Sequence, residues 1–287
     1  MSVTASGRPT FGQRFVERAK AFGPVCVGID PHESLLRDWG LPVSAAGVEK
    51  FSAICVEAFA DVACVVKPQV AFYERFGSAG FAALERTIQQ LREAGVLVIA
   101  DAKRGDIGST MAGYAAAWLS DDSPLCCDAV TVSPWLGFGS LAPVIELAES
   151  TGRGAIVLAA TSNPEAPDVQ RAEVPHQTTA GSHGPITLAQ SIVDQVAEAN
   201  AVHDGTGNLG VVVGATVEQP PRLDTVGGVI LMPGVGAQGG TVDDVKRIAG
   251  HSAGLVSPNV SRAVLSAGPD VEAMRKSIEV TTANMLK

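Results

Sequence analysis

Short apolar runs alternate with amphipathic segments along most of the chain. The runs are rich in β-branched and aliphatic residues, and one of them, 96–99, is bounded on its amino side by Gly95. Runs of this kind are typical of strands buried on both faces of a parallel sheet. They predict eight strands, at 24–30, 62–67, 96–101, 129–133, 155–160, 209–213, 228–232 and 254–257.

Segments with apolar residues at helical spacing lie between these runs. They predict helices at about 10–19, 44–59, 78–93, 107–119, 139–149, 186–202 and 242–248. Eight alternating strand and helix units without a break in composition favour an α/β fold, a (β/α)8 TIM barrel, over a doubly wound sheet. We therefore expect residues 1–287 to form a single barrel domain with an N-terminal helix, and residues 1–9, which are polar, to be frayed.

The alternation breaks at 161–184. This stretch carries Pro164, Pro167, Pro175 and Gly181 and has little periodicity. Long irregular segments inside compact domains are usually lids or disordered. We expect a long lid loop after the fifth strand.

Composition limits the classes of partner that the protein can bind and leaves the fold prediction unchanged. The formal net charge of −9 disfavours a nucleic-acid or anionic-membrane surface and leaves room only for a local basic pocket. The five cysteines have no metal-ligand spacing and are expected to be reduced core thiols. No apolar signal core or membrane-spanning run is present, so we expect a cytoplasmic protein with a small-molecule partner.

Ionisable residues stand at the ends of the first three predicted strands. Asp30 ends the first and Lys67 the second, and the third runs into Asp101 and Lys103. Side chains alternate along a strand, so Asp101 and Lys103 are expected to point the same way. A single charge at a strand end is compatible with a structural ion pair, whereas four at one barrel mouth favour a functional site. Asp106 lies beyond the Arg104–Gly105 turn, which either returns it to Lys103 or carries it to another subunit.

A second pattern indicates phosphate binding. The glycine-rich segment 233–240 follows the seventh predicted strand, and Arg262 follows the eighth. Glycine-rich backbone approaches a phosphate closely and offers N–H donors. Barrels often bind phosphate with the loops after strands seven and eight, so the two features support each other.

Two motifs, in this order and spacing, resemble those of the orotidine 5'-phosphate decarboxylase family. The segment 101–110, DAKRGDIGST, is similar to that family's D-x-K-x-x-D-I-x-x-T signature, and 233–240, PGVGAQGG, resembles its phosphate and pyrimidine loop. The resemblance extends from Val25 to about Leu265, and segments 67–74 and 259–262 are similar to the longer-chain bacterial branch. Ser261-Arg262 replaces the usual Gly-Arg, and the lid is longer than the common one.

The resemblance implies a set of site residues. Asp30 and Lys67 would bind ribose hydroxyls, Thr110 would reach the neighbouring subunit's ribose, and Ser140, rather than Ser133, would contact the pyrimidine. Gln238 would bridge base and phosphate, the Ser261 amide and Arg262 would hold the phosphate, and Ser162 would begin the lid. The implied catalytic residues are Lys67, Asp101, Lys103 and a second-subunit Asp106, and the implied substrate-binding residues are Asp30, Lys67, Thr110, Ser140, Ser162, Pro233, Gln238, Ser261 and Arg262.

The implied reaction is decarboxylation of orotidine 5'-phosphate to uridine 5'-phosphate by a homodimer, with no metal and no organic cofactor. Lys103 would stabilise negative charge at pyrimidine C6 and then protonate that carbon. Three alternatives stay open: a magnesium-dependent sugar-phosphate lyase or synthase of the same barrel superfamily, a Schiff-base aldolase using Lys67 or Lys103, and a non-catalytic nucleotide-binding barrel. The five histidines share no ligand spacing and are expected to be surface or loop residues.

Overall fold

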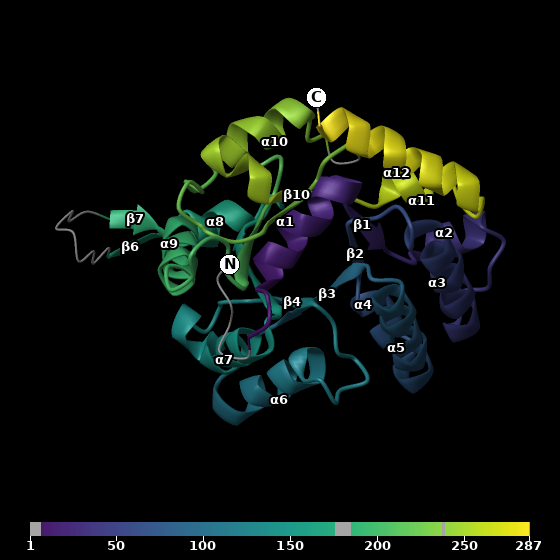
Figure 1. Cartoon of the computed structure of the whole chain (residues 1–287), viewed down its shortest axis with the longest axis horizontal. Helices are drawn as coiled ribbons and strands as arrows, with labels where there is room; N and C mark the ends of the chain where they lie inside the picture. Colours follow the sequence, from purple (N-terminus) through teal and green to yellow (C-terminus); the bar gives the residue numbers. More distant parts are fainter. Residues whose placement is uncertain (1–6, 176–184, 237–238, 287) are drawn as a thin grey trace.

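A closed barrel of eight parallel strands forms the centre of the molecule (Figure 1). The computed structural model describes residues 7–175, 185–236 and 239–286. The strands pair in the closed order β1-β10-β9-β8-β5-β4-β3-β2. Their bounds are β1 Cys26–Ile29, β2 Val65–Pro68, β3 Leu97–Arg104, β4 Ala129–Val132, β5 Gly154–Ala160, β8 Leu209–Val213, β9 Ile230–Pro233 and β10 Val256–Val260. The (β/α)8 barrel predicted from the alternating pattern is confirmed.

Helices surround the barrel, and short helices follow several strands. Among the longer ones, α3 and α5 pack against each other, as do α6 and α7. The helical segments are α1 Phe11–Phe22, α2 Glu33–Asp38, α3 Ala45–Phe59, α4 Ala71–Glu74, α5 Gly77–Glu93, α6 Gly108–Leu119, η1 Phe138–Leu141, α7 Ala142–Thr151, α8 Ala166–Gln170, α9 Leu188–Asn200, α10 Val242–Ala249, η2 Gly250–Leu255, α11 Arg262–Leu265 and α12 Val271–Met285.

Two apolar layers explain why the strands are apolar on both faces. The outer layer lies between strands and helices, and the inner one fills the barrel with residues such as Cys26, Ile99 and Ile156. Phe11 and Phe15 of α1 belong to the inner layer and close the amino-terminal end of the barrel. Each fully buried side chain of this size contributes about 1.5–3 kcal/mol. This end is therefore packed shut, and access is left to the carboxyl ends of the strands.

The segment 161–184, predicted as a long lid loop, contains short elements of secondary structure. Helix α8 lies within it, and β6 (Glu173–Pro175) pairs antiparallel with β7 (Pro185–Thr187). The β6-β7 pair projects from the body of the molecule (Figure 1). These elements are only three to five residues long, too short for a periodic pattern to show in the sequence. Residues 176–184 of the predicted lid lie outside the described residues.

Smaller differences concern element boundaries. Helix α9 begins at Leu188 because Thr187 ends β7 and caps the helix, its side chain accepting the N–H of Gln190 at 3.1 Å. Strand β10 begins at Val256 because η2 occupies 250–255. Arg8, in the segment expected to be frayed, pairs with Asp121 at 3.1 Å.

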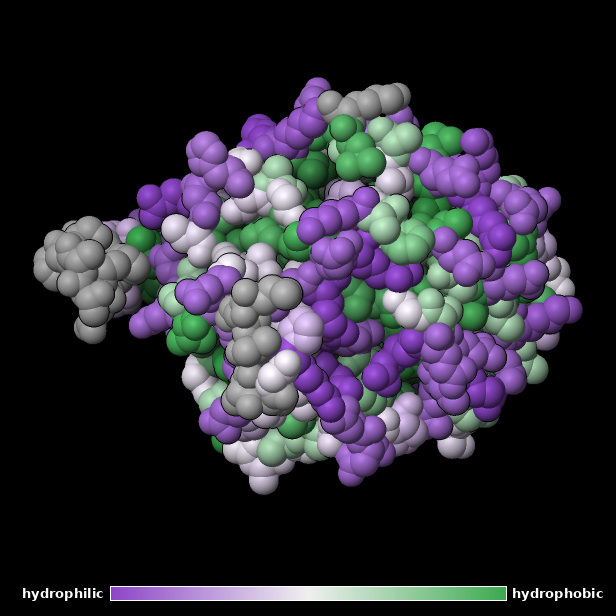
Figure 2. All heavy atoms as spheres, in the orientation of Figure 1, coloured by the Kyte–Doolittle hydropathy of each residue, from purple (hydrophilic) through white to green (hydrophobic). Residues whose placement is uncertain are grey.

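A membrane-spanning helix must be both long and apolar. None of the helices among the described residues combines the length and apolar character needed to cross a bilayer. On the face shown in Figure 2, hydrophilic and hydrophobic side chains are interspersed. All five cysteines are buried and form no disulfide.

Candidate active site

A cavity of about 570 Å³ opens at the carboxyl ends of the strands. Apolar side chains of β5, β8 and β9 line one part of it, namely Leu158, Val212 and Leu231. The side formed by β1, β2 and β3 is charged. The four strand-end residues singled out in the sequence, Asp30, Lys67, Asp101 and Lys103, all line this one cavity.

Asp101 is the centre of the charged side, and its carboxylate accepts four hydrogen bonds. Oδ2 accepts from Lys67 Nζ at 2.8 Å and Gln69 Nε2 at 3.0 Å. Oδ1 accepts from Lys103 Nζ at 2.5 Å and Thr131 Oγ1 at 3.0 Å. A carboxylate offers about four lone-pair positions, so these donors fill it. Burial alone would raise the pKa of Asp101, but the two ammonium groups outweigh it and hold that pKa well below its usual range.

Two residues that line the cavity, besides the buried Lys67, have acceptor oxygens without a partner in the described part of the chain. Burial would lower the pKa of Lys67, but the carboxylates of Asp101 and Asp30 hold it above its usual value. Oδ1 of Asp30 and Oδ1 of Asn259 are buried without a hydrogen-bond partner among the described residues. An unpaired buried oxygen costs about 1–3 kcal/mol. Both residues line the cavity, which makes a bound molecule a candidate partner for these oxygens.

Lys103 has an unusual backbone. Its φ of 50° makes it the one described non-glycine residue with positive φ, and the pairing of β3 with β4 shifts register between Ala100 and Arg104. This conformation costs a side-chain-bearing residue about 1–2 kcal/mol. The Lys103 N–H donates to Thr131 Oγ1 at 2.9 Å. The side chain of Lys103 is 46% exposed while its ammonium stays bonded to Asp101, so it is held in place and still accessible from the cavity.

Arg104 anchors the end of β3 from outside the cavity. It forms an ion pair with Glu74, and its guanidinium lies 5.6 Å from the Tyr114 ring centroid and 5.9 Å from that of Trp118. It also donates to the Ala102 carbonyl at 3.0 Å. The sequence alone does not decide whether Arg104 is an exposed turn residue or a dimer contact. Within one chain it is a structural contact.

Most of the residues predicted to bind the phosphate are among those that the structure describes. Pro233, Gly234, Ser261 and Arg262 line the cavity. Gly28 leaves room for the Ser261 side chain, because a Cβ at residue 28 would lie 1.9 Å from Ser261 Oγ. Gln238, predicted to bridge base and phosphate, lies outside the described residues.

Four other predicted site residues do not line the mouth cavity of this single chain. Asp106 Oδ1 accepts the N–H of Ile107 at 2.8 Å, and the described contacts of Lys103 place its ammonium on Asp101 instead. Thr110 is exposed in the first turn of α6. Ser140 Oγ donates to the Gly137 carbonyl at 2.7 Å. Ser162 lines a neighbouring cavity.

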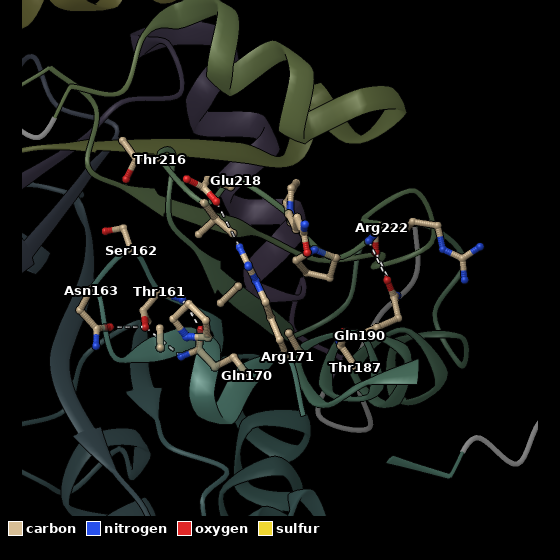
Figure 3. Close-up of a pocket in the computed structure, with 18 of the residues that line it drawn as sticks. Thr161, Ser162, Asn163, Gln170, Arg171, Thr187, Gln190, Thr216, Glu218 and Arg222 are labelled. Carbon is tan, nitrogen blue, oxygen red and sulfur yellow. Dashed lines mark hydrogen bonds and ion pairs between the residues drawn. The ribbon is translucent and has the colours of Figure 1, made fainter. Parts of the chain in front are cut away.

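That second cavity, also about 570 Å³, lies between the segment after β5 and the loop after β8 (Figure 3). Thr161 borders both cavities. Arg171 faces Glu218 across it at 3.6 Å, and Gln190 Oε1 accepts the Arg222 N–H at 2.7 Å. Among the described residues, no buried side-chain atom that lacks a partner lines this cavity. The mouth cavity, which has two such atoms, is therefore the candidate active site.

Three residues at or behind the mouth received no role from sequence reasoning: Gln69 and Asn259, which line the cavity, and Thr131, which lies behind it. Gln69 stands two residues after Lys67, and Asn259 lies in the final strand, so their position at strand ends could have indicated both. Thr131 had no such signal, because it lies inside an apolar strand and is fully buried.

Comparisons with known proteins agree with this geometry. The profile described as Orotidine 5'-phosphate decarboxylase / HUMPS family matches residues 23–277. The chain belongs to this family. The match covers every strand of the barrel and the charged mouth.

Individual members of the orotidine 5'-phosphate decarboxylase family are similar over nearly the whole chain. Orotidine 5'-phosphate decarboxylase of Corynebacterium glutamicum is 61% identical over 278 residues, which is 96% of this chain and 97% of that protein. The Corynebacterium efficiens enzyme of the same name is 61% identical over 277 residues, 96% of each chain.

Solved structures support the same assignment. A Streptomyces avermitilis crystal structure, provisionally assigned as an orotidine 5'-phosphate decarboxylase, has a TM-score of 0.90 at 48% identity and covers 97% of this chain and 95% of its own. Leishmania donovani OMP decarboxylase has a TM-score of 0.72 at 28% identity, with 97% and 100% covered.

Proposed function

We propose that this chain converts orotidine 5'-phosphate to uridine 5'-phosphate and carbon dioxide, as a cytoplasmic enzyme. The observation that carries the proposal is the Asp101 carboxylate. It accepts a hydrogen bond from the Lys103 ammonium, which it holds at the cavity, and three more from other donors. A fixed ammonium stabilises negative charge that develops beside it during a reaction. Family membership indicates which reaction uses it.

In the proposed step the bond between pyrimidine C6 and the carboxylate breaks, and carbon dioxide leaves. The electron pair stays on C6, where the Lys103 ammonium stabilises it and then transfers a proton to it. Neutral Lys103 regains a proton from solvent. Because the ammonium interacts with the carbanion more strongly than with the intact substrate, its binding energy lowers the barrier. Asp101 keeps the ammonium directed at the cavity.

The remaining roles follow from the positions around the cavity. The unpartnered oxygen of Asp30, with Lys67 beside it, suits ribose hydroxyls, and the Asn259 oxygen offers one more acceptor. Arg262 and Ser261, with Pro233 and Gly234 at the end of the neighbouring strand, suit the phosphate. Gln238 is proposed for the same group from the resemblance to the family. Ser140 and Ser162 are proposed for the base and the lid, which requires the segment after β5 to move toward the mouth.

We also propose a homodimer in which Asp106 and Thr110 complete the partner's site. Neither residue lines the mouth cavity of its own chain. Three large apolar side chains nearby are exposed. Ile107, next to Asp106, is 62% exposed, and Trp135 and Leu136, in the loop after β4, are 72% and 53% exposed. Exposed apolar side chains that cluster on loops indicate a protein interface. A two-fold interface would give each cavity the partner's Asp106.

The site geometry disfavours two alternatives. A magnesium-dependent lyase needs several carboxylate oxygens for the metal, but the donors on Asp101 already occupy its lone pairs, and the described residues hold no cluster of three metal-ligating side chains. A Schiff-base aldolase needs a neutral amine, whereas the raised pKa of Lys67 keeps that residue protonated. A non-catalytic nucleotide-binding barrel is separated from the proposal by turnover alone.

The decisive experiment follows the loss of orotidine 5'-phosphate absorbance in excess chelator, with uridine 5'-phosphate and carbon dioxide quantified as products. We expect stoichiometric conversion at full rate. Binding of uridine 5'-phosphate without turnover would favour the non-catalytic barrel. Activity lost in chelator and restored by magnesium would favour the lyase.

The shared site is tested by mixing two inactive variants, Lys103→Ala and Asp106→Asn. In a mixed dimer one cavity has an intact Lys103 and an intact partner Asp106, so random exchange should restore about a quarter of wild-type activity. No recovery after confirmed subunit exchange, or a monomer in sedimentation at assay concentration, would refute the dimer proposal.

A further inference from the structure

Thr131 lies behind the charged side of the mouth cavity and does not line it. It is on β4, is fully buried, and is not among the residues that border the cavity. Ala129, two residues earlier on the same strand, belongs to the apolar cluster inside the barrel. Side chains two apart on a strand share a face, so Thr131 brings a hydroxyl to the barrel interior at the level of Asp101.

The hydrogen bonds of this hydroxyl have only one possible direction. Thr131 Oγ1 lies 2.9 Å from the Lys103 backbone N and 3.0 Å from Asp101 Oδ1. A backbone N–H can only donate and an ionised carboxylate can only accept. The hydroxyl therefore accepts from Lys103 and gives its single proton to Asp101. One side chain thus connects the backbone of one catalytic residue to the carboxylate of the other.

Both partners of Thr131 need such a connection. Lys103 has a φ of 50°, a conformation that side-chain-bearing residues rarely adopt, and the β3–β4 ladder is interrupted between Ala100 and Arg104. The Thr131 hydroxyl provides the Lys103 N–H with a partner where the regular ladder is broken. On the other side it occupies the lone pair of Asp101 Oδ1 that the Lys103 ammonium leaves free.

We propose that Thr131 is a positioning residue for the decarboxylation, whose hydroxyl holds the Lys103 backbone and the Asp101 carboxylate in the arrangement that presents the ammonium to pyrimidine C6. This inference rests on the proposed function. Thr131 touches no substrate, so it acts on the chemical step and not on nucleotide binding. Its loss allows the ammonium to shift relative to C6, and a displacement of about 1 Å costs up to about 100-fold in rate.

The test compares Thr131→Val, which keeps the shape and removes the hydroxyl, with Thr131→Ser, which keeps the hydroxyl. We expect kcat of the valine variant to fall about 10- to 100-fold with KM and uridine 5'-phosphate affinity within about threefold of wild type. The serine variant should recover most of kcat. Thr87→Val is a matched control, because Thr87 is 3% exposed and donates 2.7 Å to a helix carbonyl outside the site. It should retain wild-type kcat.

Three outcomes would overturn the proposal: wild-type kcat in a folded Thr131→Val protein, equal losses in the valine and serine variants, or a loss confined to KM. If the valine variant does not fold, Thr131→Ala provides the same comparison with serine. Amide hydrogen exchange at Lys103 is an independent readout, expected to accelerate in the valine or alanine variant and not in serine. If the wild-type protein does not turn over orotidine 5'-phosphate, the proposed function fails, and unchanged Lys103 exchange in the valine variant would separately refute the positioning role.

Discussion

Two buried carboxylates lie at opposite ends of the β3–β4 pair and differ in what their cations face. Asp101, at the mouth, is 8% exposed, and Asp128, at the amino-terminal end, is 7% exposed. Each accepts a hydrogen bond from a cationic side chain, Lys67 and Lys103 at the mouth and Arg14 at the other end. Burial and ion pairing therefore do not distinguish a structural site from a catalytic one.

The surroundings do distinguish them. At the amino-terminal end, Asp128 Oδ2 accepts the N–H of Val98 at 2.9 Å, and Arg14 also donates to the Gly152 carbonyl at 3.0 Å. Arg14 belongs to α1, which closes the barrel there. At the mouth, Lys103 borders a cavity, and Asp30 and Asn259, each with an oxygen unpartnered among the described residues, line the same space. A carboxylate that joins elements stabilises the fold, and one that directs a cation into a polar cavity supports chemistry.

The largest effect is expected when the cation at the mouth is removed. Lys103→Ala loses both the charge beside C6 and the proton donor, so kcat/KM should fall on the order of 10^4-fold or more. Uridine 5'-phosphate binding, measured by calorimetry, should persist because Lys103 is not among the residues proposed to bind the phosphate.

Lys50→Ala is the matched control, since Lys50 is exposed on α3, and its kcat/KM should equal that of the wild type. Near-normal turnover by Lys103→Ala would refute the proposed mechanism. It would also refute the distinction between a catalytic mouth and a structural amino-terminal end of the barrel.

The corresponding change at the other end should affect stability and not turnover. Asp128→Ala leaves Arg14 without its carboxylate and the Val98 N–H without a partner, which should lower the free energy of unfolding by about 2–4 kcal/mol. Urea denaturation measures this loss, and kcat/KM well below the unfolding transition should stay within about twofold of wild type. A folded Asp128→Ala protein with strongly reduced kcat would show that the two ends are coupled.

Burial on both faces and element length explain which parts of the fold were predictable. Strands covered on both faces need apolar residues at every position, so their runs in the sequence marked the barrel. Helix α8 and strands β6 and β7 were missed because their short lengths leave no periodicity. The boundary of β9 was predicted early because Val229 is buried in the barrel interior before the strand begins at Ile230. The Val229 carbonyl already accepts the Val211 N–H of β8 at 3.0 Å, so the predicted start lies close to where pairing begins.

At the site, the sequence predicted contacts better than the geometry behind them. Alternation along a strand correctly placed Lys103 beside Asp101, but the real Lys103 leaves the regular strand conformation with positive φ. Thr131 could not be predicted, because its role depends on the interrupted register between β3 and β4. Residues at strand ends are visible from the order of the chain, whereas residues behind them depend on how neighbouring strands align.

The smallest of these effects concerns acid stability at the mouth. The pKa of Asp101 is held below its usual value, so in acid the unfolded chain binds a proton before the folded one does. The stabilisation is complete above the unfolded pKa, about 4, and is lost as the pH falls toward the lower folded value, a loss on the order of 2 kcal/mol. Asp101→Asn cannot titrate, so it should be less stable than wild type at pH 7, and the difference should narrow below pH 4. Urea denaturation at pH 7 and pH 3, at one protein concentration, measures both. A difference that stays constant with pH would mean that Asp101 draws no stability from the ammonium groups around it.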